Sequence, residues 1–342
     1  MAHILVIRLS ALGDVAMAIP VVYSLAVQYP QHEITVLSRT VWQPLFQELP
    51  PNVHFIGADP TGRHKGWWGL NSLYAELKAK RFDYIADFHN VLRTKYLDLR
   101  FRLANKPVAS ICKGRKGKKM LVRRQDKVLE NQKSSFRRYA DVLERLGFPV
   151  LLNFSSIYGE GKGDFAEIET IVGRKTQKWI GIAPFAKHIG KIYPLEYQEQ
   201  VVAHFAADPS VKVFLFGGGK SEQEVFERWT SKYPTLTSMI GKLNMRTELN
   251  LMSHLDVMLS MDSANMHLAS LVNIPVVSVW GATHPYAGFM GWKQLPVNTV
   301  QLDLECRPCS VYGQKPCWRG DYACLREITP EQVIAKIEGI IS

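Results

Sequence analysis

The sequence predicts an α/β protein with two domains, each built around a parallel β-sheet. Apolar runs of strand length alternate with segments of helical periodicity along the chain. The 342 residues are enough for two domains of about 150 residues each. A Gly-rich polar stretch at 159–164 interrupts the alternation, which then starts again. We therefore expect domains at 1–160 and 161–328, followed by a C-terminal helix at 329–342.

The N-terminal half opens with a predicted β-α-β unit. Residues 3–8 form an apolar strand, a short loop follows, and the apolar positions of 15–28 recur with a helical period. Residues 33–37 predict the second strand. The remaining elements expected in this half are a loop at 57–69, a strand at 82–88 and a helix at about 135–146 that ends at Gly147.

The C-terminal half repeats the alternation of strands and helices. A final helix begins at Pro330, with Thr329 as its N-cap. Because open parallel sheets bind ligands at the carboxyl ends of their strands, we expect site residues in the loops that follow the strands. The predicted strands of this half are 179–183, 211–216, 256–261 and 275–280, and the helices are 195–207, 221–232 and 263–272.

The composition excludes several classes of protein. With 46% hydrophobic and 21% charged residues, the chain is neither disordered nor a small disulfide scaffold. The first apolar run is interrupted by Arg8, and none approaches the roughly 18 residues of a membrane span, so we expect neither signal peptide nor transmembrane helix. The five cysteines do not form a disulfide framework, which predicts a reducing compartment.

Positive charge is concentrated in one segment. The net charge is +11, but residues 1–150 hold 24 Lys and Arg against 12 Asp and Glu, whereas the rest is almost balanced. Residues 100–138 alone hold 14 basic and two acidic residues, which predicts contact with an anionic partner. Only Phe101 and Phe136 are aromatic there, which weakens a nucleic-acid-binding alternative. A solvated face, with a mobile loop at about 113–119, is the other interpretation.

The loop after the first strand carries one carboxylate at a helix start. Gly13 permits a tight turn, and Asp14 begins the following helix. Asp14 is either a helix cap or a general base that faces a ligand at the carboxyl edge of the sheet.

A second candidate site lies where the strand at 256–261 runs directly into a helix. The small side chains of Ser263 and Ala264 allow a phosphate to approach the backbone N–H groups at the helix start. Asp262 is placed to bind a hydroxyl of the same ligand, and His267 lies one turn further along the helix. Helix capping by Asp262 and ordinary packing of His267 are the structural alternatives.

Two further loops follow predicted strands. Lys187 and Lys191 lie between a strand and a helix, where either side chain can meet an anion. The run from Gly217 to Ser221 is not a P-loop, because Phe214 stands where that motif needs a glycine. It predicts a turn that lines a nucleotide pocket, with Glu222 or Glu224 near a ribose.

Four cysteines follow a C-x2-C-x7-C-x6-C pattern near the C-terminus. They fit either a structural zinc site or a long loop with reduced thiols, since the second close pair of the usual zinc pattern is missing. We expect no catalytic metal. The four residues are Cys306, Cys309, Cys317 and Cys324.

Three stretches together resemble the lipopolysaccharide heptosyltransferases, glycosyltransferase family 9. They are residues 3–14 (HILVIRLSALGD), 262–267 (DSANMH) and 280–285 (WGATHP). The resemblance covers nearly the whole chain. It implies a GT-B fold, with two Rossmann-like domains facing each other across a cleft. It also implies an inverting, metal-independent transfer of heptose from ADP-heptose to the inner core of lipopolysaccharide, without a cofactor.

The resemblance also implies roles for individual residues. Asp14 matches the catalytic base of the family. Lys191 matches the lysine that meets the diphosphate, although Tyr193 stands where the family has Trp. The family's D-T-G-x-x-H donor motif corresponds to Asp262, Ser263, Ala264 and His267, with Ser and Ala in place of Thr and Gly.

The resemblance further implies a glycolipid acceptor, the lipid A-core, and contact with an anionic membrane surface. The protein is then cytoplasmic and peripheral on the inner face of the cytoplasmic membrane, with no nucleic-acid partner. The alternative within enzymes is a GT-B transferase or epimerase that uses another nucleotide sugar. The acceptor-binding candidates are Arg93, Arg115, Lys118 and Arg123.

Overall fold

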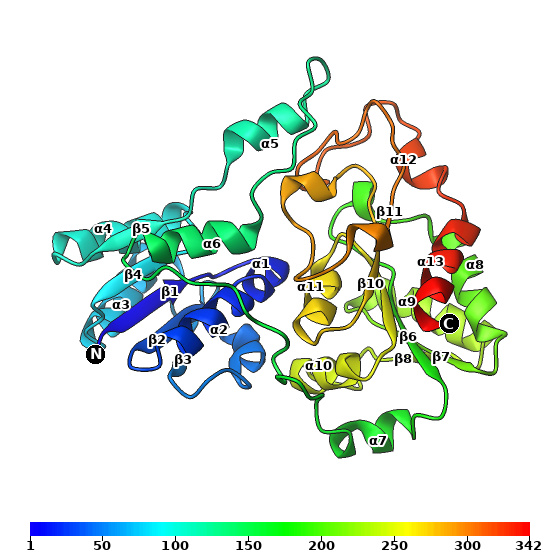
Figure 1. The fold of residues 1–342 in the computed structure, drawn as a ribbon, viewed down its shortest axis with the longest axis horizontal. Coiled ribbons are helices and arrows are strands. Elements are labelled where there is room, and N and C mark those ends of the chain that lie inside the picture. Colours follow the sequence, from blue (N-terminus) through cyan, green and yellow to red (C-terminus); the bar gives the residue numbers. More distant parts are fainter. The chain divides into compact units, whose positions relative to one another are not determined.

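The computed structural model describes residues 1–342, which divide into two compact units. Unit 1 comprises residues 1–113 and 133–157, and unit 2 comprises 114–132 and 158–342. Each unit contains one parallel β-sheet with helices packed against it (Figure 1). The α/β class predicted from the sequence is confirmed. None of the helices combines the length and the apolar composition needed to cross a bilayer.

Unit 1 has a five-stranded parallel sheet in the order β3-β2-β1-β4-β5. The central strand β1 places Leu5 opposite Thr35 on one side and Ile85 on the other. The strands are β1 (His3–Ile7), β2 (Glu33–Arg39), β3 (Val53–Ala58), β4 (Tyr84–Asp87) and β5 (Val108–Ser110). The helices are α1 (Leu12–Ala16), α2 (Ile19–Gln28), α3 (Gly66–Ala79), α4 (Leu92–Leu103) and α6 (Ser135–Glu144), with a 3-10 helix at Thr40–Phe46.

Two expectations for unit 1 were wrong in detail. The single helix expected at 15–28 is two helices, because Pro20 has no N–H to continue α1 and instead occupies the first turn of α2. The loop expected at 57–69 ends earlier, because α3 begins at Gly66 and buries Leu70, Leu73 and Leu77 in the core.

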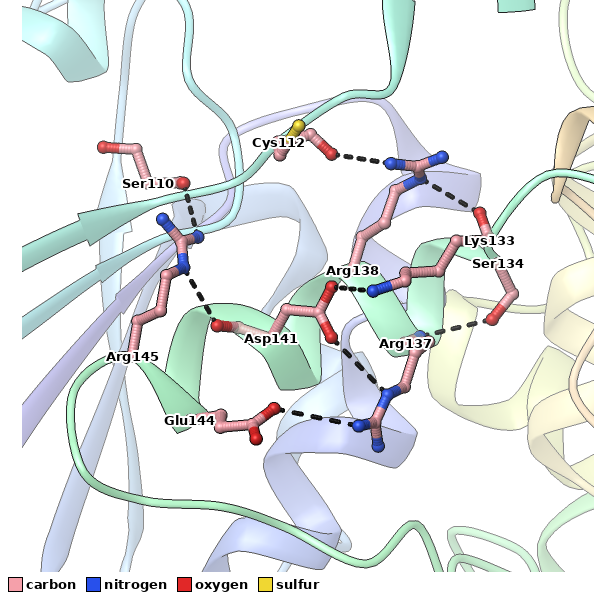
Figure 2. Close-up of polar contacts among 9 residues, drawn as sticks. All are labelled: Ser110, Cys112, Lys133, Ser134, Arg137, Arg138, Asp141, Glu144 and Arg145. Atoms are coloured by element: carbon pink, nitrogen blue, oxygen red, sulfur yellow. Dashed lines mark hydrogen bonds and ion pairs between the residues drawn. The ribbon is translucent and has the colours of Figure 1, made fainter. Parts of the chain in front are cut away.

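Helix α6 returns the chain to unit 1 and is tied to it by charged side chains (Figure 2). The Ser134 hydroxyl accepts a hydrogen bond from Arg137 N at the helix start. Arg138 donates to the carbonyl oxygens of Cys112 and Lys133, at 3.0 Å each, and Lys133 Nζ lies 2.7 Å from an oxygen of Asp141. Part of the basic segment predicted to meet anions is therefore engaged within the protein.

Unit 2 has a six-stranded parallel sheet in the order β11-β10-β9-β6-β7-β8. The predicted strands and helices of this half are present, and α13 begins at Pro330 with Thr329 as N-cap, as expected. The strands are β6 (Lys178–Ala183), β7 (Val211–Leu215), β8 (Thr237–Ser238), β9 (Val257–Met261), β10 (Val276–Val279) and β11 (Thr299–Val300). The helices are α5 (Arg115–Leu121), α7 (Ala166–Val172), α8 (Leu195–Ala206), α9 (Lys220–Lys232), α10 (Met245–Ser253), α11 (Ala264–Leu271), α12 (Ala323–Arg326) and α13 (Pro330–Ile341).

The boundaries of the units differ from the expected domains in two respects. Helix α13 packs on α8 and shares the core of unit 2 through Val333 and Ile337, so it is not a separate piece. Residues 114–132 belong to unit 2, because Lys127 Nζ donates to the carbonyl oxygens of Glu305 and Arg307 at 2.7 and 2.8 Å. This segment also contains helix α5, where a mobile loop was the alternative interpretation.

A pair of buried carboxyl groups lies at the carboxyl end of β4. Asp87 accepts hydrogen bonds from the Thr94 hydroxyl at 2.8 Å and from His89 N at 2.7 Å. Asp98 accepts one from the Ser110 hydroxyl at 2.7 Å. Burial raises the pKa of Asp98 to about 7, and the charge of Asp87 adds to the shift.

We predict that Asp98→Asn makes the protein less sensitive to high pH. In the unfolded chain the Asp98 carboxyl ionises near pH 4, whereas in the folded protein it stays neutral up to about pH 7. Its contribution to stability is therefore lost as the pH rises from about 4 to about 7. The melting temperature of the variant relative to the wild type should rise between about pH 5 and about pH 8.

The control for this variant is Asp126→Asn, at an exposed position with a positive φ that Asn also tolerates. Its melting temperature should follow the wild type at both pH values. Identical pH profiles for Asp98→Asn and the wild type would contradict the prediction.

Candidate functional site

In unit 1 the loop after β1 holds Asp14 against a buried arginine. Arg8 Nη2 lies 2.7 Å from Asp14 Oδ2, and Arg8 Nη1 donates to the carbonyl oxygen of Phe88 at 2.7 Å. Burial opposes the charged form of Arg8, but Tyr139 and Asp14 beside it raise its pKa above the usual value. The guanidinium therefore stays charged and fixes the position of the carboxylate.

The same oxygen of Asp14 also acts in helix capping. Oδ2 accepts a hydrogen bond from Ala11 N at 3.2 Å, so Asp14 is the third residue of α1 and binds back to the N-cap residue rather than being the N-cap itself. Oδ1 has no partner within the protein, and the side chain is one-third exposed. One oxygen is thus held in place while the other is available to a ligand.

The loop after β4 adds a neutral imidazole beside this pair. His89 Nε2 lies 3.4 Å from the Ser10 hydroxyl, and the ring is buried. Burial, with the positive charge of Arg8 nearby, lowers the pKa of His89 to about 3. The ring is therefore uncharged at neutral pH.

A cavity of about 240 Å³ opens at this edge of the sheet. Its two cations are Arg39, the last residue of β2, and Arg93, in the first turn of α4, and no acidic side chain lines it. The cavity therefore suits a polar, anionic ligand. Its lining residues are Leu9, Ser10, Arg39, Pro60, Thr61, His89, Val91 and Arg93.

In unit 2 the predicted residues Lys191 and Asp262 form an ion pair. Lys191 Nζ lies 2.9 Å from Asp262 Oδ2, and the Thr283 hydroxyl donates to the same oxygen at 2.7 Å. Asp262 is buried, and Lys191 is exposed at only 16% of its side chain. These residues follow β6, β9 and β10, three strands adjacent in the sheet, so the parallel order brings them together.

Glycines allow the close packing that supports Lys191. Gly313 has a φ of +76°, and a Cβ there would lie 2.5 Å from Lys191 Cγ. A Cβ on Gly281 would lie 2.7 Å from the carbonyl oxygen of Gly190. The aliphatic part of Lys191 therefore rests directly on the backbone of the C-terminal loop.

The N-terminus of α11 lies directly after Asp262. Ser263 is its N-cap, but the Ser263 hydroxyl lies 3.2 Å from the Ser260 hydroxyl and does not cap the helix. The first-turn N–H groups, beginning at Ala264, thus remain available to an anion. His267 is buried on the same helix.

Glu222, in the first turn of α9, binds back to the loop between β7 and α9. Its Oε2 accepts a hydrogen bond from Gly218 N at 2.7 Å, and burial raises its pKa. It shares the sheet edge with Lys191 and Asp262 but contacts neither, so its contact with a ribose stays a prediction.

Arg307 anchors the segment that holds Thr283. Its side chain is buried and donates to the carbonyl oxygens of Gly281 (2.6 Å), Thr283 (3.0 Å) and Leu302, and to the Gln301 side chain (3.0 Å). The position of Asp262 thus depends on a residue 45 positions away in the sequence.

The structure separates the acceptor-binding candidates. Arg93 lies in unit 1 at the cavity described above, whereas Arg115, Lys118 and Arg123 lie in unit 2. Lys118 is buried, with Nζ 3.9 Å from the centre of the Phe289 ring, which weighs against an acceptor contact. Arg115 and Arg123 are exposed.

The cysteines give the zinc prediction no support. All are free thiols, and no group of three or more His, Cys, Asp or Glu side chains is arranged to hold a metal ion. Burial raises the pKa of Cys309 and raises that of Cys324 to about 12, which keeps both thiols protonated. The four residues concerned are Cys306, Cys309, Cys317 and Cys324.

Sequence reasoning missed five residues that shape these sites. Arg8 and His89 carry a weak signal, because each is a polar residue just after a buried strand. Thr283 lies in the 280–285 motif but had no assigned role. Arg39, at the end of β2, carries the same weak signal, whereas Arg307 carries none, since it belongs to no motif.

Comparison with known proteins gives consistent results. Residues 70–317 match the family model for glycosyltransferase family 9 (heptosyltransferase). The chain is 28% identical to a lipopolysaccharide core heptosyltransferase, OpsX, of Haemophilus influenzae, over 82% of this chain and 79% of that protein.

Solved structures share the fold. A family 9 glycosyl transferase from Veillonella parvula has a TM-score of 0.75 at 21% identity, covering 99% of this chain and 97% of that one. The ADP-heptose lps heptosyltransferase II of E. coli has a TM-score of 0.69 at 18% identity, with 99% and 98% coverage. These structures confirm the expected GT-B class.

We predict that Arg307→Lys destabilises the protein. A lysine cannot donate to four separate oxygens, so buried carbonyl groups lose their partners, at a cost of about 3 kcal/mol or more in the free energy of unfolding. Urea unfolding measures this difference. Arg326→Lys is the control, because Arg326 is exposed and its contact with Glu196 spans 3.4 Å. Equal midpoints for the two variants would contradict the prediction.

Proposed function

The chain belongs to glycosyltransferase family 9 (heptosyltransferase), and on that premise we propose that it transfers heptose from ADP-heptose to the inner core of lipopolysaccharide. It is a heptosyltransferase of lipopolysaccharide core biosynthesis, as its relatives are. The E. coli relative named for ADP-heptose supports the same donor. The proposal further states that transfer inverts the anomeric centre and needs no metal ion.

One observation carries the assignment of the donor site: the Lys191–Asp262 pair lies beside the uncapped N-terminus of α11. A departing diphosphate gains negative charge, which a lysine and helix N–H groups stabilise without a metal. Asp262, which accepts a hydrogen bond from the Thr283 hydroxyl, holds the ammonium group of Lys191 in place before the donor binds. Ser263, Ala264 and His267 are the remaining donor-binding residues of the proposal, with Glu222 near the ribose.

Asp14 is the general base of the proposal. Its unpartnered Oδ1 accepts the proton of the acceptor hydroxyl as that oxygen attacks the anomeric carbon of heptose. The bond from that carbon to the diphosphate breaks on the opposite face, and ADP leaves. Arg8 keeps the carboxylate oriented through Oδ2.

The acceptor is assigned to unit 1 and the donor to unit 2. Arg39 and Arg93 at the cavity of unit 1 suit the phosphate and carboxylate groups of the lipid A-core. Arg115 and Arg123 belong to unit 2, and their contact with the acceptor stays a prediction. A protein that takes up a glycolipid at an anionic membrane works as a peripheral protein on the inner face of the cytoplasmic membrane.

The experiment that tests this function measures ADP release from ADP-heptose with truncated lipopolysaccharide acceptors in EDTA. We expect turnover to survive EDTA and to fall about 100-fold or more in Asp14→Asn, which removes the base. Asp83→Asn, at the opposite end of β4, should keep wild-type activity. Loss of turnover in EDTA contradicts the metal-free mechanism, and full activity of Asp14→Asn contradicts the base. Turnover only with another nucleotide sugar would overturn the donor assignment.

We predict that Gly313→Ala weakens ADP binding by about tenfold, because its Cβ displaces the Lys191 side chain. Isothermal titration with ADP measures the effect. Gly320→Ala is a matched control: its φ of +84° imposes similar backbone strain, but its Cβ meets open space. Both variants should lose thermal stability, and only Gly313→Ala should lose affinity. Equal ADP affinities would show that the contact does not position Lys191.

A further inference from the structure

Unit 1 exposes a group of large apolar side chains on two neighbouring helices. Trp67 and Trp68 lie in the first turn of α3, and Trp68 is 84% exposed. On α4, Leu92, Leu99 and Leu103 are exposed at 87%, 54% and 73%. These five residues define the α3–α4 face. Contiguous exposed apolar groups of this kind mark binding surfaces.

Spacing and direct contact make this face continuous. Leu92, Tyr96, Leu99 and Leu103 recur at i, i+4, i+7 and i+11, which places them along one side of α4. The Tyr96 ring contacts the Trp67 ring at 4.7 Å between centroids, which joins the two helices. Figure 1 shows α3 and α4 close together in unit 1.

This stripe is separate from the side of α4 that packs on the sheet. The core side buries Leu97 and Phe101 together with Thr94 and Asp98. Helix α4 therefore has one apolar side inside the protein and a second one in solvent. Packing within unit 1 does not explain why the solvent-facing side of α4 is apolar.

The charges around the face are positive. Lys65 lies just before α3, and Lys95 and Arg102 lie on exposed positions of α4; none of the three forms an ion pair. The only acidic residue of α4 is Asp98, which is buried, and the only one of α3 is Glu76, which pairs with Arg63 and His64. Exposed Trp and Leu with flanking Lys and Arg are typical of a surface that lies in the headgroup region of an anionic bilayer.

The face is continuous with the cavity proposed for the acceptor. Val91 and Arg93 line that cavity, and Leu92 between them is exposed on the face. This adjacency suits an acceptor whose saccharide enters the cavity while its acyl chains stay in a bilayer.

We propose that the α3–α4 face docks unit 1 on an anionic membrane. Trp68, Leu92, Leu99 and Leu103 enter the headgroup region, and Lys65, Lys95 and Arg102 contact acidic lipid headgroups. This inference rests on the proposed function, because a lipid-linked acceptor is the reason for membrane docking. Its test does not require the protein to be active.

The test is flotation of the full chain with vesicles of phosphatidylcholine containing about 30% phosphatidylglycerol. The wild type should bind these vesicles and not pure phosphatidylcholine. Binding should fall about tenfold in Trp68→Ser/Leu103→Ser and in Lys95→Glu/Arg102→Glu. The control is Leu295→Ser/Val297→Ser, which removes two exposed apolar side chains from unit 2. It should bind like the wild type.

Activity separates this inference from the proposed function. With a lipid-free oligosaccharide acceptor, Trp68→Ser/Leu103→Ser should turn over like the wild type, and with the acceptor in vesicles it should be about tenfold slower. Undiminished vesicle binding by this variant overturns the docking face, even if the enzyme is active. If the variant loses vesicle binding but the wild type transfers no heptose, the docking face is supported and the proposed function is rejected. Light scattering provides a further test. If the wild type forms a dimer that the variant abolishes, and the wild type does not bind vesicles, this face is a contact between two copies and the proposal is overturned.

Discussion

Both sheets are entirely parallel, and this constraint determines where chemistry can take place. Every strand of a parallel sheet delivers its following loop to the same edge, so groups far apart in the sequence become neighbours. In unit 1 that edge gathers Asp14 and His89 from the loops after β1 and β4. In unit 2 it gathers Lys191, Asp262 and Thr283. The antiparallel alternative would send half of these loops to the other edge.

Each edge orients its carboxylate in the same way. A carboxylate that is partly or fully removed from water needs a cation or hydrogen-bond donors to replace its lost hydration. Asp14 has Arg8 and a backbone N–H, and Asp262 has Lys191 and a hydroxyl group. In both cases the supporting group is itself held by carbonyl oxygens or close backbone contact, so the charges are oriented before any ligand arrives. Preorganisation of this kind is what stabilises charge that develops during a reaction.

Local signals made part of this structure predictable. The cap at Thr329 and the apolar run of β1 depend only on neighbours in sequence, and both were found. The start of α3 was missed because Gly, Trp and charged residues hide the burial of Leu70, which only tertiary packing reveals. Asp14 was predicted as a site residue because it follows a strand; the structure shows its pairing with Arg8, and its role as a base stays a prediction. The role of Arg307 and the assignment of residues 114–132 to unit 2 depend on contacts between positions far apart in the sequence. No local sequence pattern predicts such contacts.

Because residues 114–132 belong to unit 2 but lie between the two pieces of unit 1, part of unit 2 is synthesised before unit 1 is complete. Unit 1 is complete once residue 157 has left the ribosome, because its last piece is 133–157. At that moment the intervening basic segment has no docking site, since Lys127 and Gln132 bind backbone groups at 286–307. The segment therefore stays undocked, as a loop tethered at both ends to unit 1, until almost the whole chain has been synthesised. A fragment cut after residue 157 would keep the sheet of unit 1 intact and would carry this loop unfolded.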